Sequence, residues 1–101
     1  GHFGGALSKL IVAPENASTK YFDFRLSTYQ PKGYVKEHTH EVEEQIYYIL
    51  EGEGIMELDG DKKIVRPGLT IFIPPQVRHA LYNTGTKDLT FLVVSSPPLK
   101  P

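Results

Sequence analysis

Prolines and glycines interrupt this sequence so often that a long helix is not expected. The chain of 101 residues contains eight prolines and nine glycines, which fall between short runs of β-branched, aromatic and aliphatic residues. No segment sustains the helical period of 3.6, whereas several runs alternate apolar and polar residues as strands do. Many short strands separated by turn signals are typical of a sandwich or a small barrel. The sequence therefore predicts one all-β domain.

Eight runs are predicted to form strands, and the breaks between them have turn chemistry. The dipeptide Asp59-Gly60 is a signal for a two-residue hairpin. The segments RPG and IPP end strand pairing, because proline has no backbone N–H to donate to a ladder. A second hairpin loop with glycine is predicted at NTGTKD. The predicted strands cover residues 9–12, 20–29, 45–50, 54–58, 63–66, 69–73, 79–83 and 89–94.

The composition excludes several kinds of site and partner. Without cysteine there is no disulfide, thiolate zinc site or thiol nucleophile. The net charge is −1 and no run of lysine or arginine occurs, so neither nucleic acid nor an anionic membrane is an expected partner. No apolar stretch approaches the roughly 20 residues of a membrane span. The opening GHFGG lacks the regions of a signal peptide, and we expect a cytoplasmic protein.

Three of the four histidines form a pattern that suits a metal ion. His38 and His40 are two positions apart, and residues i and i+2 of a strand point to the same face. His79 follows about forty residues later, at the start of a predicted strand that a barrel can bring back against the pair. Three neutral imidazoles and one oxygen donor make an ordinary site for a divalent first-row metal.

The oxygen donor is expected where the strand near residue 45 begins. Four side chains there carry oxygen, and they are Glu41, Glu43, Glu44 and Gln45. If Gln45 faces inward, Tyr47 and Ile49 face inward with it. If Glu44 faces inward, the alternate residues Ile46, Tyr48 and Leu50 follow instead. Both sets are apolar enough for a core, so periodicity alone leaves the two possibilities open.

Two segments, GYVKEHTHEVEEQIYYILEG and GLTIFIPPQVRHALYN, resemble the two motifs of the cupins. The first cupin motif begins with a glycine, which five residues separate from His-x-His. Three or four residues then precede a glutamate, and six more residues separate this glutamate from a second glycine. Here four residues separate Gly33 from His38, one fewer than in the motif. Counting back from Gly52 shows that Gln45 occupies the position of the motif's glutamate, with four residues between it and His40.

The second motif matches through a glycine, a proline, a histidine and an asparagine. These are Gly68, Pro74, His79 and Asn83, and Gln76 replaces the motif's inner glycine. With the fifteen residues between them, the two motifs cover about half of the chain. A lone His-x-His is a weak signal, but two motifs with this spacing are specific.

The resemblance to small single-domain cupins of bacteria and archaea implies the fold and its assembly. The fold is a double-stranded β-helix (jelly-roll) barrel, which we place at residues 20–96. Residues 1–19 are then an N-terminal arm that forms an interface strand, and residues 97–101 are a proline-rich tail. Cupins of this size pair through a sheet, and residues 7–12 are apolar enough to cross to a partner, so we predict a homodimer.

The resemblance also implies the metal ligands, which are His38, His40, Gln45 and His79. Glu44 is the alternative to Gln45 as the fourth ligand. The metal itself is left open, since three imidazoles and an amide accommodate Zn, Ni, Fe, Mn or Cu. Four neutral ligands leave the metal's charge of +2 uncompensated, which strengthens it as a Lewis acid for an anionic or carbonyl-containing substrate.

Cupins with three histidines and a glutamine resemble lyases, enzymes that process sugar acids and polyketide cyclases, as well as oxygenases. The leading hypothesis is an enzyme of the lyase, isomerase or cyclase type, in which Tyr47 or Glu44 assists proton transfer. Glu44 is otherwise a solvated residue. The alternatives are a metal-dependent dioxygenase, a non-catalytic module that binds a sugar or organic acid, and a metal-free isomerase. Tyr29 and Arg25 are placed near the mouth of the barrel, although Arg25 is expected to be a surface residue.

Overall fold

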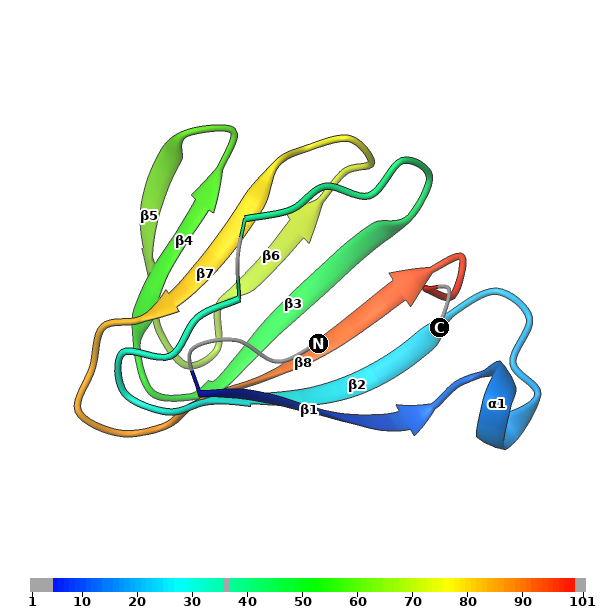
Figure 1. Ribbon diagram of the computed structural model, residues 1–101, viewed down its shortest axis with the longest axis horizontal. Coiled ribbons are helices and arrows are strands. Elements are labelled where there is room, and N and C mark those ends of the chain that lie inside the picture. Colours follow the sequence, from blue (N-terminus) through cyan, green and yellow to red (C-terminus); the bar gives the residue numbers. More distant parts are fainter. Residues whose placement is uncertain (1–4, 36, 100–101) are drawn as a thin grey trace.

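The computed structural model describes residues 5–35 and 37–99 of the chain. This part contains eight β-strands and a single-turn helix (Figure 1). In chain order the elements are β1 (Ala6–Val12), α1 (Pro14–Ala17), β2 (Asp23–Tyr29), β3 (Glu44–Glu51), β4 (Gly54–Leu58), β5 (Asp61–Val65), β6 (Thr70–Ile73), β7 (His79–Asn83) and β8 (Leu89–Ser96). The prediction of an all-β domain is confirmed. The described helix has four residues, so no described helix is long enough to cross a membrane.

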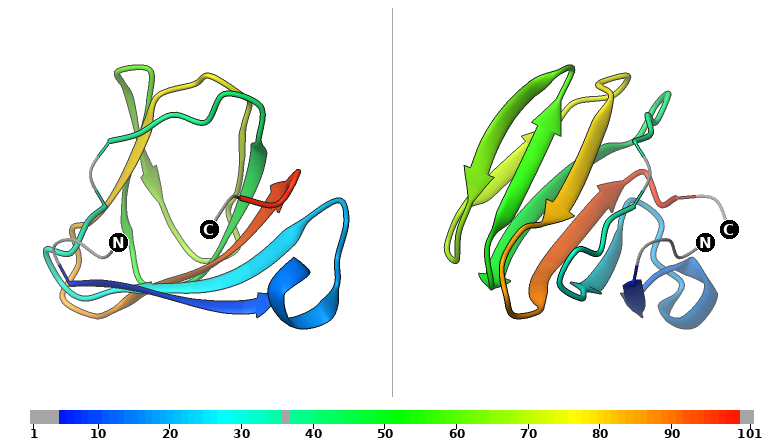
Figure 2. Two further views of the ribbon diagram at one scale, coloured as in Figure 1. Left: turned by 45° about the vertical axis from the view of Figure 1, so that its right-hand side comes forward. Right: turned by 60° about the vertical axis from the view of Figure 1, so that its left-hand side comes forward.

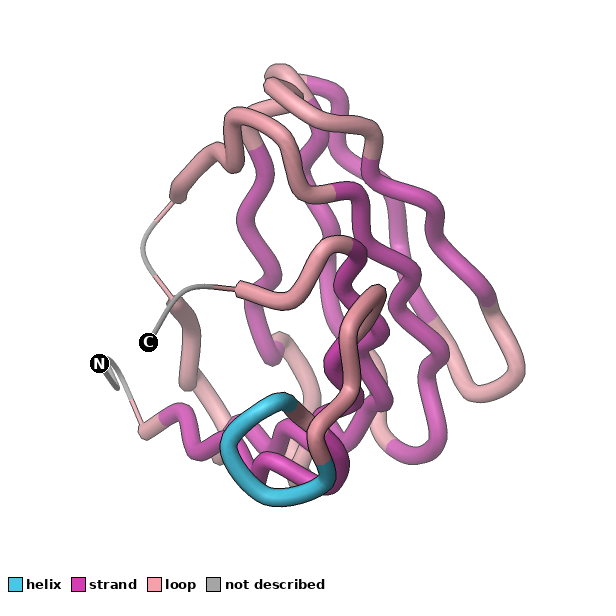
Figure 3. Tube along the Cα trace, turned by 90° about the vertical axis from the view of Figure 1, so that its right-hand side faces the viewer, coloured by secondary structure: helices cyan, strands magenta, loops and turns pink. Residues whose placement is uncertain are grey.

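The strands form two antiparallel sheets that enclose a common interior (Figure 2). One sheet has the order β1-β2-β8-β3-β6 and the other has the order β5-β4-β7. The last strand of the chain, β8, therefore lies between β2 and β3. The short helix lies at one end, outside the barrel of strands (Figure 3). This arrangement is the jelly-roll barrel predicted from the sequence.

Alternation of side chains along β3 and β8 decides which residues face the interior. Strand β3 buries Gln45, Tyr47 and Ile49 and exposes the residues between them. Strand β8 buries every second residue from Leu89 to Ser95. Because successive residues of a strand point to opposite faces, the inward position of Gln45 settles the ambiguity that the sequence left open.

An aromatic stack fills one part of the interior. The ring of Phe91 lies parallel to that of Tyr47, with centroids 5.1 Å apart and planes 16° apart. The ring of Tyr29 meets Phe91 edge-on at the same centroid distance, with planes 85° apart. Such offset and edge-to-face pairs contribute about 0.5–1.5 kcal/mol each beyond the apolar area that they bury. Ile49, Met56, Leu81 and Leu89 belong to the same core.

Polar residues occupy the other part of the interior, where three neighbouring strands place them in one row. Gln45 of β3 is opposite Ser95 of β8, and Ser95 is opposite Asp23 of β2. All three side chains are buried. A buried row of this kind requires hydrogen-bond partners, since an unpaired polar group in an apolar interior is destabilising.

The turns and termini agree with the sequence in part. Asp59 and Gly60 both have positive φ, 47° and 89°, as the predicted two-residue hairpin requires. Strand β1 is longer than predicted, and it pairs along β2 of the same chain. Helix α1 was not predicted; Pro14 lies at its start, and the backbone N–H of Ala13 donates to the side chain of Asn16. Residues 1–4 of the predicted arm and 100–101 of the predicted tail lie outside the described residues.

Two motif glycines offer a test of how closely the barrel is packed. Gly52 and Gly68 have similar positive φ, 83° and 89°, so alanine is equally strained at both. An added Cβ at Gly52 would overlap the backbone carbonyl of Asp88, whereas at Gly68 it would meet no atom within 4 Å. We expect Gly52→Ala to lower the free energy of unfolding by about 1–3 kcal/mol more than Gly68→Ala does, measured by urea denaturation. Equal losses would contradict this account.

Candidate metal centre

Backbone hydrogen bonds hold the two halves of the histidine pattern together. The segment between β2 and β3 carries His38 and His40, and it lies beside the start of β7. The N–H of His38 donates to the carbonyl of His79 over 3.0 Å, and the N–H of His79 donates back over 2.9 Å. The N–H of Gln76 donates to the carbonyl of His40 over 2.7 Å. His38 and His79 thus form a single antiparallel bridge outside the named strands.

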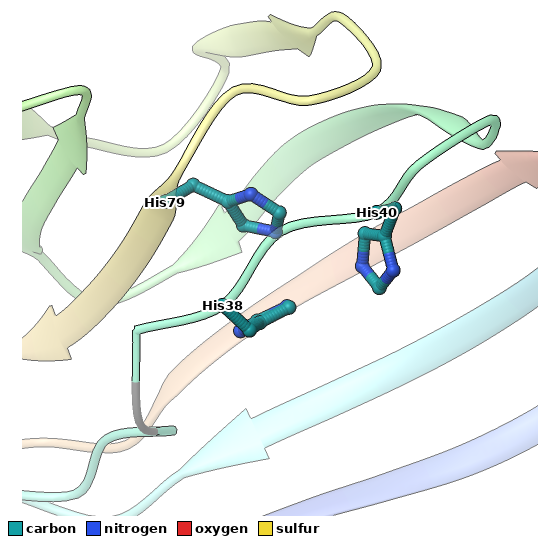
Figure 4. A group of neighbouring side chains, drawn as sticks. All are labelled: His38, His40 and His79. Carbon is teal, nitrogen blue, oxygen red and sulfur yellow. The ribbon is translucent and has the colours of Figure 1, made fainter.

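The three imidazole rings turn toward one another (Figure 4). The ring centroids of His38 and His79 are 4.2 Å apart, those of His38 and His40 are 5.0 Å apart, and those of His40 and His79 are 5.4 Å apart. One nitrogen from each ring lies within 4.8 Å of the other two. Nitrogens this close can share one metal ion. The structure therefore brings together the three histidines that the sequence selected.

A hydrogen bond fixes the tautomer of His79. Its Nδ1 lies 3.0 Å from the carbonyl oxygen of Val77. A carbonyl can only accept, so Nδ1 carries the proton and Nε2 keeps a free lone pair. Burial lowers the pKa of His79 to about 4; the bond to Val77 opposes this shift, and the neighbouring His38 and His40 add to it. The ring is neutral near pH 7, which is the form that binds metals.

The surroundings of His40 also favour the neutral form of its ring. Burial lowers its pKa, and the nearby His38 acts in the same direction, while the negative charge of Glu43 opposes them. The Nε2 atom of His40 is buried and has no hydrogen-bond partner among the described residues, as is also true of Nε2 of His79.

The side chain of Gln45 carries the oxygen atom that can complete the set of ligands. Its Nε2 donates to the hydroxyl of Ser95 over 2.9 Å, and its Oε1 is buried without a partner in the described part of the chain. Buried acceptors are nearly always paired, so the unpaired acceptors of Gln45, His40 and His79 need an explanation. A divalent metal ion would satisfy Oε1 of Gln45 and Nε2 of His40 and His79 together. The residues present fit such an ion.

His38, His40 and Gln45 line a cavity of about 140 Å³. Its walls are formed by Ser8, Arg25, Ser27, Tyr29, Val35, His38, His40, Gln45, Tyr47, Phe91, Val93 and Leu99. A water molecule takes up about 30 Å³ in the liquid, so the space corresponds to roughly five waters. It suits a ligand of a few non-hydrogen atoms.

The other predicted site residues divide between this cavity and the surface. Tyr47 lines the cavity, and burial raises the pKa of its phenol, which therefore keeps its proton at neutral pH. Glu44 lies on the opposite face of β3, where it is exposed, so the structure does not bring it to the histidines. Arg25, expected at the surface, lines the cavity with 27% of its side chain exposed.

Sequence reasoning missed Ser95 and Asp23, the other members of the polar row. Strand β8 was predicted to end at residue 94, one residue before Ser95. The available signal was its alternation, because Ser95 is two positions beyond the inward Val93. Asp23 lay inside a predicted strand, but only the pairing of β2 with β8 places it in this row.

The sequence also matches the profile of the cupin domain family over residues 25–95. The chain belongs to the cupin family. Its matched segments are 49% identical over 61 residues to an uncharacterized protein of Methanocaldococcus jannaschii and 42% identical over 57 residues to an oxalate-binding protein of Thermotoga maritima. The match to the first protein covers 60% of this cupin and 49% of that protein, and the match to the second covers 56% and 47%. This cupin therefore matches about half the length of each relative.

Solved structures give the same family. A predicted oxalate decarboxylase from Thermotoga maritima superimposes with a TM-score of 0.83 at 32% identity, covering 90% of this cupin and 79% of that protein. The polyketide cyclase RemF from Streptomyces resistomycificus superimposes equally well, with a TM-score of 0.83 at 26% identity, covering 94% and 67% of the two chains. The cupin fold is therefore shared with proteins that are described as having different functions.

The pair Gln45–Ser95 can be tested by a double-mutant cycle in chelator-treated protein. Ser95→Ala leaves the buried amide nitrogen of Gln45 without an acceptor, which costs about 1–3 kcal/mol of stability. In a Gln45→Leu background the same change removes no hydrogen bond and should cost less. We expect a coupling energy of about 1 kcal/mol from urea denaturation of the four proteins. Additive losses would show that the hydrogen bond contributes nothing.

Proposed function

We propose that this cupin is a metal-dependent enzyme that acts on a small carboxylate or carbonyl compound by lyase, isomerase or cyclase chemistry. The ligands are His38, His40, Gln45 and His79. The observation that carries the proposal is a set of three buried acceptor atoms that have no partner among the described residues. Two belong to Gln45 and His40, which line one small cavity, and the third belongs to His79, which offers a ligand nitrogen within 4.8 Å of those of His38 and His40. The neutral state of the His79 ring supports it.

The donor set determines the chemistry. A divalent metal held by four neutral ligands keeps its double positive charge and acts as a Lewis acid toward a substrate oxygen. Tyr47 keeps its proton, so it can donate a hydrogen bond or a proton to the substrate and cannot serve as a base at neutral pH.

The relatives support a small anionic substrate. One is named an oxalate-binding protein, and one solved structure is described as a predicted oxalate decarboxylase. The polyketide cyclase among the structural neighbours supports chemistry on a carbonyl group. The name of the oxalate-binding protein also favours a second candidate function, in which this cupin binds an organic acid without converting it.

The metal site is tested first, by elemental analysis of tag-free protein. We expect about one divalent transition metal per chain in the wild type and a near-complete loss in His79→Ala, because the variant removes a ligand and leaves the backbone bridge to His38 intact. Glu44→Gln is the matched control, since Glu44 is adjacent to Gln45 but faces outward; it should retain the metal. A wild type that takes up no Zn, Ni, Fe, Mn or Cu near neutral pH would refute the proposal.

The identity of the metal then separates the chemistries. Zinc or nickel favours the Lewis-acid reactions proposed here. Iron or copper, with consumption of dioxygen when small organic acids are added, would favour the dioxygenase instead. A metal-loaded protein that binds such acids and converts none of them would favour the binding module.

We also propose that two copies of the chain pair through the outer face of the five-stranded sheet. Ile46, Tyr48 and Phe72 are 43%, 42% and 53% exposed. Strand pairing places them in two adjacent rows with apolar residues of β2 and β8, namely Phe24 and Val94 in one row and Leu26 and Leu92 in the other. A contiguous set of exposed apolar residues of this kind marks an interaction site, and a second copy of the same face is complementary to it.

Light scattering tests this assembly. We expect the wild type to have about twice the 11.3 kDa mass of one chain, and the double variant Ile46→Glu/Phe72→Glu to have the mass of one chain, since charges on the rows oppose burial. Ile64→Glu is the control, because Ile64 is 63% exposed on the other sheet. A wild type that scatters as one chain, or a double variant that stays paired, would contradict the proposal.

A further inference from the structure

We propose that Arg25 binds a carboxylate of the substrate, so that the cavity selects small organic acids with a second oxygen-bearing group for the metal. This inference rests on the proposed metal site and names the substrate class of that site. It is carried by the position of Arg25, its contact with Asp23 and the hydroxyl groups on the same wall.

The strand register places Arg25 on the wall of the cavity beside the ligand strand. Arg25 of β2 is opposite Val93 of β8, and Val93 is opposite Tyr47 of β3. Arg25 is therefore two strands away from Tyr47, a lateral distance of about 10 Å between backbones. Both side chains line the cavity with the histidines. The side chain of arginine is long. From this wall Arg25 can therefore reach a small ligand that also contacts the proposed metal ligands in the same cavity.

Asp23 holds the guanidinium of Arg25. The Nε atom of Arg25 donates to Oδ1 of Asp23 over 3.3 Å, and Nη2 donates to Oδ2 over 3.5 Å. Oδ2 also accepts the backbone N–H of Leu99 over 2.8 Å, and the Asp23 side chain is 1% exposed. Asp23 is thus a fixed, buried anchor, and it restricts the orientation of the arginine.

Arg25 retains donors for a ligand. A guanidinium has five N–H groups in a planar fork, and two of them go to Asp23. Among the described residues the structure gives the other three no acceptor. A planar fork with free N–H groups matches the geometry of a carboxylate, which is why arginine is favoured where such groups are recognised.

Two hydroxyl groups extend this donor surface. Ser8 and Ser27 line the same cavity, and their Oγ atoms are 2.9 Å apart. In such a pair one hydroxyl donates to the other, and the accepting hydroxyl still has its own hydrogen to donate. Ser27 is two residues from Arg25 on β2 and faces the same side of the sheet.

Charge and geometry have separate roles in this arrangement. The charges of Arg25 and Asp23 cancel, so the net positive charge that attracts an anion comes from the metal with its neutral ligands. Arg25 supplies direction and a preference for a carboxylate over a neutral group of the same shape. If the pair served only to fasten the segment that contains Leu99 to the barrel, Arg25→Lys, which keeps the positive charge beside Asp23, would leave this preference intact.

Calorimetric titration of the metal-loaded protein distinguishes the two roles. The probes are malonate and malonamide, which have the same number of non-hydrogen atoms and differ in charge. Arg25→Gln should weaken malonate binding roughly 10- to 100-fold, the loss of a charge-assisted hydrogen bond, and leave malonamide binding unchanged. Arg25→Lys should lose part of the preference, because it keeps the charge without the fork. Arg66→Gln, the same change at a residue that does not line this cavity, should bind both probes as the wild type does.

Metal content, measured before and after each titration, separates the possible failures. A wild type without metal refutes the proposed function, and this inference with it. A metal-loaded Arg25→Gln that keeps the malonate preference, or a metal-loaded wild type that does not prefer malonate, overturns the inference alone. If Arg25→Gln fails to fold, the folded Arg25→Lys decides, and full retention of the preference overturns the inference.

Discussion

The structure depends on two backbone hydrogen bonds between His38 and His79. They join residues that are far apart in the sequence, and they bring the segment before β3 against the start of β7. Because the bonds use main-chain atoms, they fix the two residues whatever the side chains do. The imidazoles are then free to serve as ligands, and their convergence is a property of the scaffold. Because the scaffold does not depend on the imidazoles, substitution of a histidine tests its role as a ligand separately from its role in the fold.

Much of the fold followed from local patterns. Strands β4 and β7 have the predicted bounds, and the Asp59-Gly60 turn has the expected backbone conformation. The inward side of β3 did not follow, and the reason is physical. Its outward residues Ile46 and Tyr48 are as apolar as its inward ones, so alternation has no polar face to detect. The apolar outer rows on which the proposed dimer rests are therefore the feature that obscured the position of Gln45 in the sequence.

The supporting groups of the site escaped prediction because they depend on register between distant strands. Strand β8 is last in the chain and yet lies between β2 and β3. Only this crossover aligns Asp23, Ser95 and Gln45 in one row, and no local pattern encodes it. For Arg25 the sequence left the mouth of the barrel and the surface as alternatives, since its pattern on β2 does not reveal that the inward face of that strand borders a polar cavity. The tautomer of His79 likewise depends on the local conformation at Val77.

Gln45 stands where the cupin motif has a glutamate, and its cross-strand neighbour Ser95 forms a hydrogen bond that suits an amide. An amide has a donor end and an acceptor end, and the hydroxyl of Ser95 accepts from the donor end. That bond turns Oε1 away from Ser95, and Oε1 has no hydrogen-bond partner in the described part of the chain. A carboxylate at this position would need Ser95 to donate and would add a negative charge to the ligand set. The glutamine keeps the set neutral, and the adjacent Asp23–Arg25 pair is neutral as well. Within the proposed function, the charge of the metal is then left for the substrate to balance, which favours an anion.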